Sequence, residues 1–135
     1  VQGFKQLPKE GEILVVTKSL KDVMVFHEMG IPAIATQGET QLLTNKQYEV
    51  LAKRFKRIVF NADWDEAGKL FMIKSRKKYR GIAMTFTKPE TQAKDISDYV
   101  KKFGFEKAER IVSYFKRVIM HGIYDYQLDK VRENS

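Results

Sequence analysis

The sequence predicts an α/β fold, in which a parallel sheet of about four strands is flanked by helices and followed by a helical C-terminal extension. Short β-branched apolar runs, typical of buried strands, alternate with amphipathic patterns of helical length. Strands that alternate with helices in this way run parallel, because each helix carries the chain back to the edge where the previous strand began. The expected strands cover residues 13–17, 32–36, 57–61 and 82–86.

Capping patterns mark where the intervening helices begin. Ser19 is expected to cap the first helix, with Asp22 in its first turn, and Gly30 to end it. Thr44 and Gln47 form a capping box for the second helix. The expected helices cover residues 19–30, 44–55, 66–78, 95–104 and 105–121. The chain therefore divides into an irregular lead-in (1–11), an α/β domain (12–104) and a C-terminal helical extension (105–135).

Composition narrows the class of protein. The 135 residues fit one domain, and the absence of cysteine excludes disulfides and Cys-ligated zinc within the chain and suits a reducing cytoplasm. No apolar run approaches the length of a membrane span, and we expect no signal peptide. The chain does not begin with Met, so we expect it to be a fragment or an excised domain.

The chain is strongly basic, with a net charge of +8. Much of the excess lies in two clusters, at residues 53–57 and 74–80. Such clusters suit a polyanionic partner, because each phosphate that a lysine or arginine neutralises releases counter-ions. Both clusters also fall at predicted helix ends, where cations stabilise the helix dipole without any partner. We favour contact with nucleic acid over a surface that is merely solvated.

Acidic side chains gather at the carboxyl ends of the predicted strands, where the sites of such sheets lie. Asp63 and Asp65 follow the third strand with one residue between them. Two carboxylates this close repel each other unless a cation neutralises them, and hard oxygen ligands select Mg²⁺ or Mn²⁺. The competing interpretation is that Asp63 caps the next helix and Asp65 lies in its first turn.

Further acids stand near the same edge, and each has a structural alternative. Asp22 is placed as the acid of a capping box, and Asp95 as an N-cap with Asp98 three residues later. Glu39 lies in a glycine-containing loop and could be solvated. The gathering of all these acids at one edge argues against an α/β domain in which every acid is only a cap.

Two motifs resemble the Toprim family, the catalytic domain shared by bacterial-type primases, topoisomerases and some nucleases. The family's Asp-x-Asp-x-Ala-Gly motif is matched by Asp63-Trp64-Asp65-Glu66-Ala67-Gly68. A segment typical of primases and phage primase–helicases is matched by Lys94-Asp95-Ile96-Ser97-Asp98-Tyr99. The resemblance covers about residues 12–104, and its second motif favours a primase.

The family's first motif is altered here. Lys18 stands where the family has a glutamate, and Ser19 replaces a glycine, while Asp22 is kept. Three interpretations of Lys18 are open. It could bind a phosphate at the helix N-terminus, or pair with Asp63 or Asp65 and so replace a metal in a non-catalytic module. The preferred interpretation is that Glu39 supplies the missing carboxylate.

The resemblance implies the catalytic domain of a DNA primase, a nucleotidyltransferase that joins ribonucleotides on a single-stranded DNA template with Mg²⁺ or Mn²⁺. The implied site residues fall into three groups. The implied catalytic residues are Asp63, Asp65, Asp22 and Glu39. The implied metal ligands are Asp63 and Asp65, with Asp95 and Asp98 assisting or completing the site. The implied phosphate or template contacts are Lys18, Ser19, Lys69, Arg76 and Lys77.

The alternatives are a Toprim nuclease with the same carboxylates and a degenerate Toprim module that binds nucleic acid or a replication partner without chemistry. A primase also needs parts that these residues lack, namely a zinc-binding Cys cluster and, where a helicase is attached, a Walker motif. We expect them in a longer primase chain or in a partner such as a replicative helicase. The expected location is the cytoplasm of a bacterial cell or of a phage-infected host.

Overall fold

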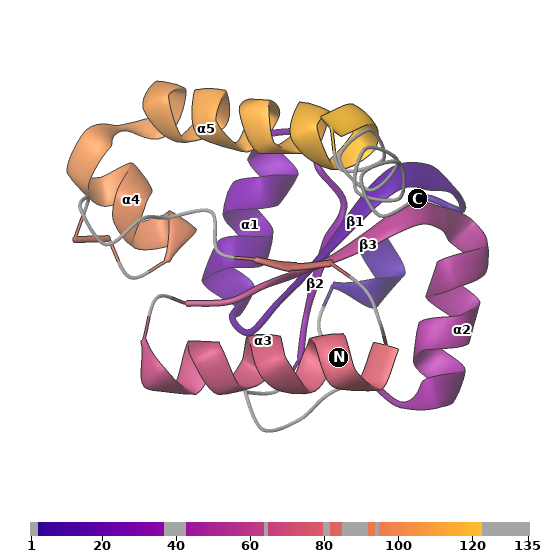
Figure 1. The fold of residues 1–135 in the computed structure, drawn as a ribbon. Coiled ribbons are helices and arrows are strands. Elements are labelled where there is room, and N and C mark those ends of the chain that lie inside the picture. Colours follow the sequence, from indigo (N-terminus) through magenta and orange to yellow (C-terminus); the bar gives the residue numbers. More distant parts are fainter. Residues whose placement is uncertain are drawn as a thin grey trace, which may run out of the picture.

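A four-stranded parallel sheet forms the centre of the fold in the computed structural model of the chain (Figure 1). The structure describes residues 3–36, 43–63, 65–79, 82–84, 92–93 and 95–122, with the backbone only at 76, 82–84 and 122. The spatial order of the strands is β2-β1-β3-β4. Their bounds are β1 Gly11–Thr17, β2 Ala33–Ala35, β3 Phe55–Asn61 and β4 Ile82–Met84.

The register places the carboxyl ends of the strands at one edge of the sheet. Val15 of β1 lies beside Ala33 of β2 on one side and Val59 of β3 on the other. Asn61, the last residue of β3, lies beside Met84 of β4. The predicted parallel sheet is thus confirmed, and the side chains that follow β1 and β3 come to neighbouring positions at this edge.

The helices follow the predicted order. Their bounds are α1 Leu20–Glu28, α2 Asn45–Arg54, α3 Glu66–Tyr79, α4 Ile96–Phe103 and α5 Phe105–Arg117. Ser19, Thr44 and Asp95 cap α1, α2 and α4, and the Thr44–Gln47 capping box is complete. None of the helices in the described ranges is long and apolar enough to cross a membrane.

Several strand boundaries differ from the predicted ones: β1 begins at Gly11 rather than at residue 13, and β2 covers Ala33–Ala35 rather than residues 32–36. The third strand begins at Phe55 rather than at residue 57, because Phe55 is buried and pairs with Gly11 immediately after α2 ends. The lead-in contains a 3-10 turn at Phe4–Gln6, and Arg54 holds this segment by donating to the carbonyl oxygens of Pro8 and Lys9. The C-terminal extension continues from α5 into a π-helical turn at Val118–Gly122, and residues 123–135 lie outside the described part.

Helices cover both faces of the sheet, so that the core has two layers. Figure 1 shows α1, α4 and α5 on one side and α3 on the other. Ile13 and Val15 of β1 face the first side, and Leu14 and Val16 face the second, as the two-residue period of a strand requires. The first layer includes buried side chains of α1, α4 and α5: Val23, Phe26, Ile96, Tyr99, Ala108 and Val112. The second includes those of α2 and α3: Leu51, Phe71 and Tyr79.

Candidate metal centre

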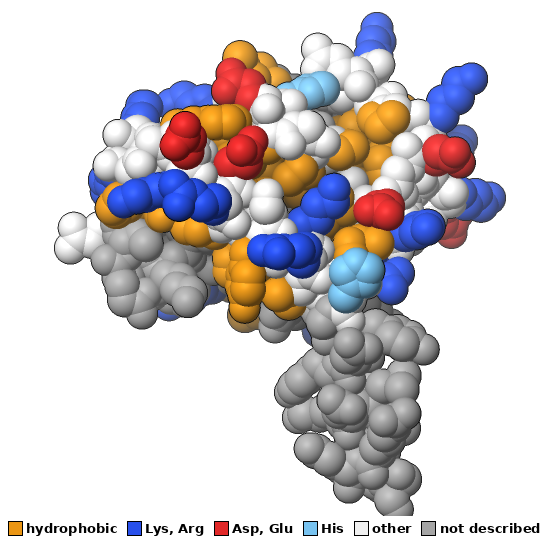
Figure 2. Space-filling view, turned by 90° about the horizontal axis from the view of Figure 1, so that it is seen from above, with side chains coloured by type: hydrophobic (Ala, Val, Ile, Leu, Met, Phe, Trp, Pro, Cys, Tyr) orange, Lys and Arg blue, Asp and Glu red, His pale blue; other side chains and the backbone are white. Residues whose placement is uncertain are grey.

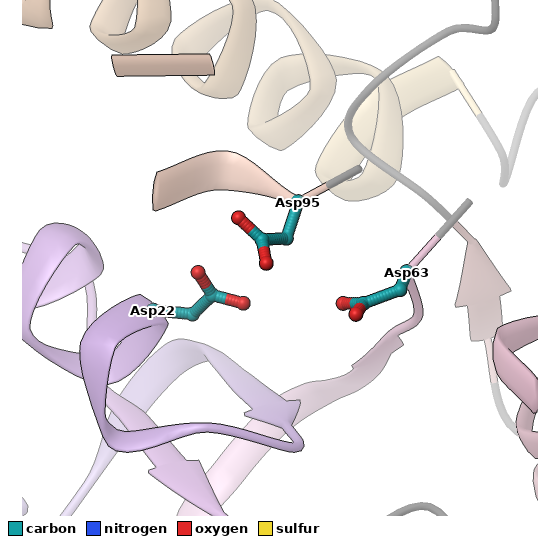
Figure 3. Close-up of side chains that lie close together, drawn as sticks. All are labelled: Asp22, Asp63 and Asp95. Atoms are coloured by element: carbon teal, nitrogen blue, oxygen red, sulfur yellow. The ribbon is translucent and has the colours of Figure 1, made fainter. Parts of the chain in front are cut away.

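Three aspartates from distant parts of the chain converge at the carboxyl edge of the sheet. Asp22 lies in the first turn of α1, Asp63 follows β3, and Asp95 caps α4. One carboxylate oxygen from each lies within 4.8 Å of the others. Figure 3 shows the three side chains pointing toward a shared space. We call Asp22, Asp63 and Asp95 the aspartate trio.

Asp22 is fully buried and held by side chains from two other segments. Its Oδ1 accepts hydrogen bonds from the Ser97 hydroxyl at 2.6 Å and the Ser97 backbone N–H at 3.1 Å, and its Oδ2 accepts from the Thr17 hydroxyl at 3.3 Å. The pKa of Asp22 is raised, chiefly by burial, while the Ser97 hydroxyl opposes the rise. Its backbone N–H still donates to Ser19 Oγ, but its carboxylate bonds to distant residues, so the capping interpretation describes only its backbone.

Asp63 is buried and forms an ion pair with Lys18. The side chain of Asp63 is 1% exposed and that of Lys18 is 22% exposed, and the contact joins Lys18 Nζ to Asp63 Oδ2. The pKa of Asp63 is raised to about 6. Burial is the largest cause of the rise, Lys18 opposes it, and the negative charges of Asp95 and Asp22 add to it. Of the three interpretations of Lys18, the pairing with Asp63 is therefore the contact present in the structure.

Gly68 allows the first turn of α3 to lie against the backbone of Asp63. A Cβ placed on Gly68 would lie 1.9 Å from the backbone oxygen of Asp63, so no larger residue fits without a shift of the backbone. The Gly68 N–H donates to Asp65 Oδ1 at 2.6 Å. Asp65 therefore makes the capping contact at the start of α3, and it is not part of the aspartate trio. The competing interpretation had Asp63 as the cap of this helix, whereas in the structure Asp65 makes that contact and Asp63 belongs to the aspartate trio.

Asp95 both caps a helix and faces the site. Its Oδ1 accepts a hydrogen bond from the Asp98 backbone N–H at 2.8 Å. The first turn of α4 therefore fixes the orientation of this carboxylate. Asp98 lies outside the aspartate trio, and its Oδ2 pairs with Lys102 Nζ at 3.4 Å. The sequence left open whether Asp95 caps a helix or belongs to the site. In the structure it does both.

The remaining sequence-predicted residues lie elsewhere or outside the described ranges. Ser19 caps α1 through its hydroxyl. Lys69 lies on the exposed surface of α3 and pairs with Glu66 at 3.3 Å, and Lys77 is exposed on the same helix. Glu39 and the side chain of Arg76 lie outside the described residues.

Sequence reasoning missed two residues that orient the site, Ser97 and Thr17. Both are polar side chains next to the motifs, and both donate to Asp22. Thr17 is fully buried at the end of an otherwise apolar strand. A buried hydroxyl needs a hydrogen-bond partner, so a polar residue closing an apolar run was the available signal.

The donor set fits a hard divalent cation. The aspartate trio offers only carboxylate oxygens, which are the ligands that Mg²⁺ and Mn²⁺ prefer. Two of these aspartates are buried, and buried carboxylates of like charge repel one another unless a cation lies between them. Asp22, Asp63 and Asp95 are therefore the residues that would hold such an ion.

The fold and the site are those of an α/β domain with a carboxylate cluster, suited to a divalent cation, at the carboxyl edge of its parallel sheet. The model of the Toprim-like family matches residues 15–100. The chain belongs to the Toprim-like family. Toprim domains occur in primases and nucleases, and membership implies a metal-binding function related to nucleic acid. Neither the curated proteins nor the solved structures provide a match to the chain.

Proposed function

We propose that this chain is the catalytic Toprim domain of a DNA primase, which joins ribonucleotides on single-stranded DNA with Mg²⁺ or Mn²⁺. The observation that carries the proposal is the meeting of Asp22, Asp63 and Asp95, because each comes from a different one of the three motifs of the family pattern. The primase-like segment at residues 94–99 supplies one of them, Asp95. That segment distinguishes a primase from a nuclease within the family.

Each member of the site has a separate task in this proposal. Asp22, Asp63 and Asp95 hold the metal, and Ser97 and Thr17 fix the orientation of Asp22. A bound metal ion positions phosphates and stabilises the charge of phosphoryl transfer. Burial of Asp22 and Asp63 keeps water from competing for their oxygens. Asp65 and Asp98 support the site indirectly, through the first turns of α3 and α4.

Phosphate and template contacts are assigned to exposed cations around the sheet. We propose that phosphates are contacted by three cations of α3, namely Lys69, Lys77 and Arg76. Lys53 and Lys56 are exposed beside a hollow of about 440 Å³ at the start of β1 and β3, which is the edge of the sheet opposite the aspartate trio. Figure 2 shows the side that α4 and α5 cover in Figure 1, where Lys and Arg side chains are interspersed with Asp, Glu and hydrophobic side chains.

A second candidate function is a binding module without chemistry. The ion pair between Lys18 and Asp63 favours it, because a lysine can neutralise a buried carboxylate without a metal. In that case the domain holds nucleic acid or a replication partner, and its carboxylates have no catalytic task. Metal binding by the aspartate trio separates the two candidates.

Primer extension tests the proposed function directly. The chain is incubated with single-stranded DNA, an annealed short RNA, ribonucleoside triphosphates and Mg²⁺ or Mn²⁺, and the products are resolved by length. Supplying the RNA removes the need for the zinc-binding part that starts synthesis in a longer primase. We expect extension by the unaltered chain and none by Asp63→Asn. Glu109→Gln is the matched control, because Glu109 is an exposed acid on α5 outside the aspartate trio.

The products distinguish the alternatives. A shortened DNA template in place of a lengthened RNA identifies a nuclease. Retention of DNA with neither product, and with no metal bound, identifies a binding module. Metal binding without extension of the RNA overturns the primase proposal for this chain.

A further inference from the structure

Lys18 occupies an unusual position for a lysine. It directly follows β1 and precedes Ser19, the N-cap of α1, so its backbone is fixed by two regular elements. Its ammonium group contacts Asp63 Oδ2, while the side chain is only 22% exposed. Taking a lysine and an aspartate out of water costs free energy that only a close mutual contact offsets. Lys18 is therefore a constituent of the site rather than a surface charge near it.

The charges at the site set a limit on the cations that it can hold. Three ionised aspartates carry three negative charges, and Lys18 brings one positive charge into contact with one of them. The sum is two negative charges, which one divalent ion neutralises. A second divalent ion would make the site strongly positive, and like charges at such distances repel. With an uncharged or acidic side chain at position 18, this limit would not apply.

The other two carboxylates of the aspartate trio are held by uncharged donors, whereas Asp63 is contacted by the ammonium group of Lys18. Asp22 Oδ1 accepts from Ser97, and Asp95 Oδ1 accepts from the Asp98 backbone N–H. These donors are uncharged, and they orient a carboxylate without cancelling its charge. Lys18 differs from them because its charge has the same sign as a metal ion.

We propose that Lys18 is a built-in counter-ion of the aspartate trio, which restricts the site to a single divalent cation and competes with that cation for Asp63. The inference rests on the proposed metal-dependent function, but it concerns the number and affinity of the ions rather than the reaction. Without a metal, Lys18 holds Asp63 in its buried position. When a divalent ion binds, Lys18 moves away from Asp63 Oδ2 and its ammonium group becomes available to a phosphate.

Titration with Mn²⁺ tests the inference. Binding to the 135-residue chain is followed by calorimetry, and free Mn²⁺ is counted by electron paramagnetic resonance. We expect one ion per unaltered chain. Lys18→Met is expected to bind Mn²⁺ about 10- to 100-fold more tightly, the range in which neighbours of metal ligands commonly act. Lys18→Glu is expected to bind two ions, and Lys18→Arg one.

Lys21→Met is the matched control, because it removes the same charge from an exposed position in the first turn of α1. The inference is overturned if the unaltered chain binds two ions, or if Lys18→Met gains no more affinity than Lys21→Met. In both cases the proposed metal-dependent function still stands. If Lys18→Met does not fold, the ion counts for the unaltered chain, Lys18→Arg and Lys18→Glu decide the question.

Two other results would also decide whether the proposed metal-dependent function is correct. If neither the unaltered chain nor Lys18→Met binds Mn²⁺, the metal-dependent function and the inference both fail. If only Lys18→Met binds it, Lys18 replaces the metal instead of competing with it. That result overturns the inference and supports the non-catalytic binding module.

Discussion

Replacing Gly68 with alanine should destabilise the chain, although helix propensity alone predicts the reverse. Gly68 lies in the first turn of α3, and alanine in a helix is favoured over glycine by about 1 kcal/mol. In the structure, however, the added Cβ would lie 1.9 Å from the backbone oxygen of Asp63, whereas real Cβ atoms almost never approach closer than 3.0 Å. The start of α3 or the backbone of Asp63 must therefore move by more than an ångström.

The magnitude of the effect follows from this displacement. Overpacking a well-packed site costs about 1–3 kcal/mol, and the upper end applies because the opposing atom is backbone and cannot rotate away. Unfolding entropy of about 2.1 cal/mol/K per residue converts a loss of ~3 kcal/mol into a fall in Tm of about 10 °C for a chain of this length. The move of Asp63 should also weaken metal binding.

Denaturant unfolding and a thermal melt of Gly68→Ala measure the effect. Ala67→Gly is the matched control, because Ala67 is the exposed neighbour in the same helical turn and its loss should cost about 1 kcal/mol through propensity alone. A Gly68→Ala chain as stable as the unaltered chain, or more stable, would refute the steric reasoning.

Three further predictions concern the site and the basic surface. Ser97→Ala removes the 2.6 Å hydrogen bond to Asp22 and should lower the free energy of unfolding by about 1.5–3 kcal/mol, measured in denaturant. Asp63 has its pKa raised to about 6 in the fold, so its carboxyl favours the folded state below about pH 4, and this contribution is lost as the pH rises through 6. Without metal, the free energy of unfolding relative to Asp63→Asn should therefore fall by about 2 kcal/mol between pH 4 and 7. Charge reversal of Lys53 and Lys56 should weaken single-stranded DNA binding, and should make its salt dependence shallower by about 0.7 for each lost phosphate contact.

Each of these predictions has its own control. Ser113→Ala removes an exposed hydroxyl from α5 and should leave stability nearly unchanged. A constant difference between the unaltered chain and Asp63→Asn from pH 4 to 7 would show that Asp63 keeps an ordinary pKa. Charge reversal of Lys101 and Lys107, two exposed lysines on α4 and α5, should affect DNA binding less than reversal of Lys53 and Lys56. Equal losses in both pairs would indicate a response to net charge alone.

The fold and the caps could be predicted because they depend on nearby residues. The capping box of α2 joins residues three apart, and the strands are recognisable from short apolar runs. The parallel order of strands and helices then placed the carboxyl ends at one edge. Asp63 and Asp95 were found for that reason, since each follows a recognisable element.

The internal arrangement of the site could not be predicted, because it depends on contacts between distant segments. The hydrogen bond that orients Asp22 comes from Ser97, 75 residues away, and no local pattern connects the two. The separation of Asp63, which faces the aspartate trio, from Asp65, which caps α3, likewise follows from the close packing of Gly68 against Asp63, which is a three-dimensional relationship. Only the approach of α3 decides which carboxylate caps the helix and which faces the aspartate trio.

Titration of Mg²⁺ into the chain, followed by amide chemical shifts, tests the central claim most directly. We expect saturable shifts at Asp22, Asp63 and Asp95, which vanish in Asp63→Asn. They should persist in Asp65→Asn, because Asp65 caps α3 and asparagine caps a helix equally well. The absence of site-specific shifts up to millimolar Mg²⁺, or their loss in Asp65→Asn as completely as in Asp63→Asn, would contradict a metal centre built on the aspartate trio.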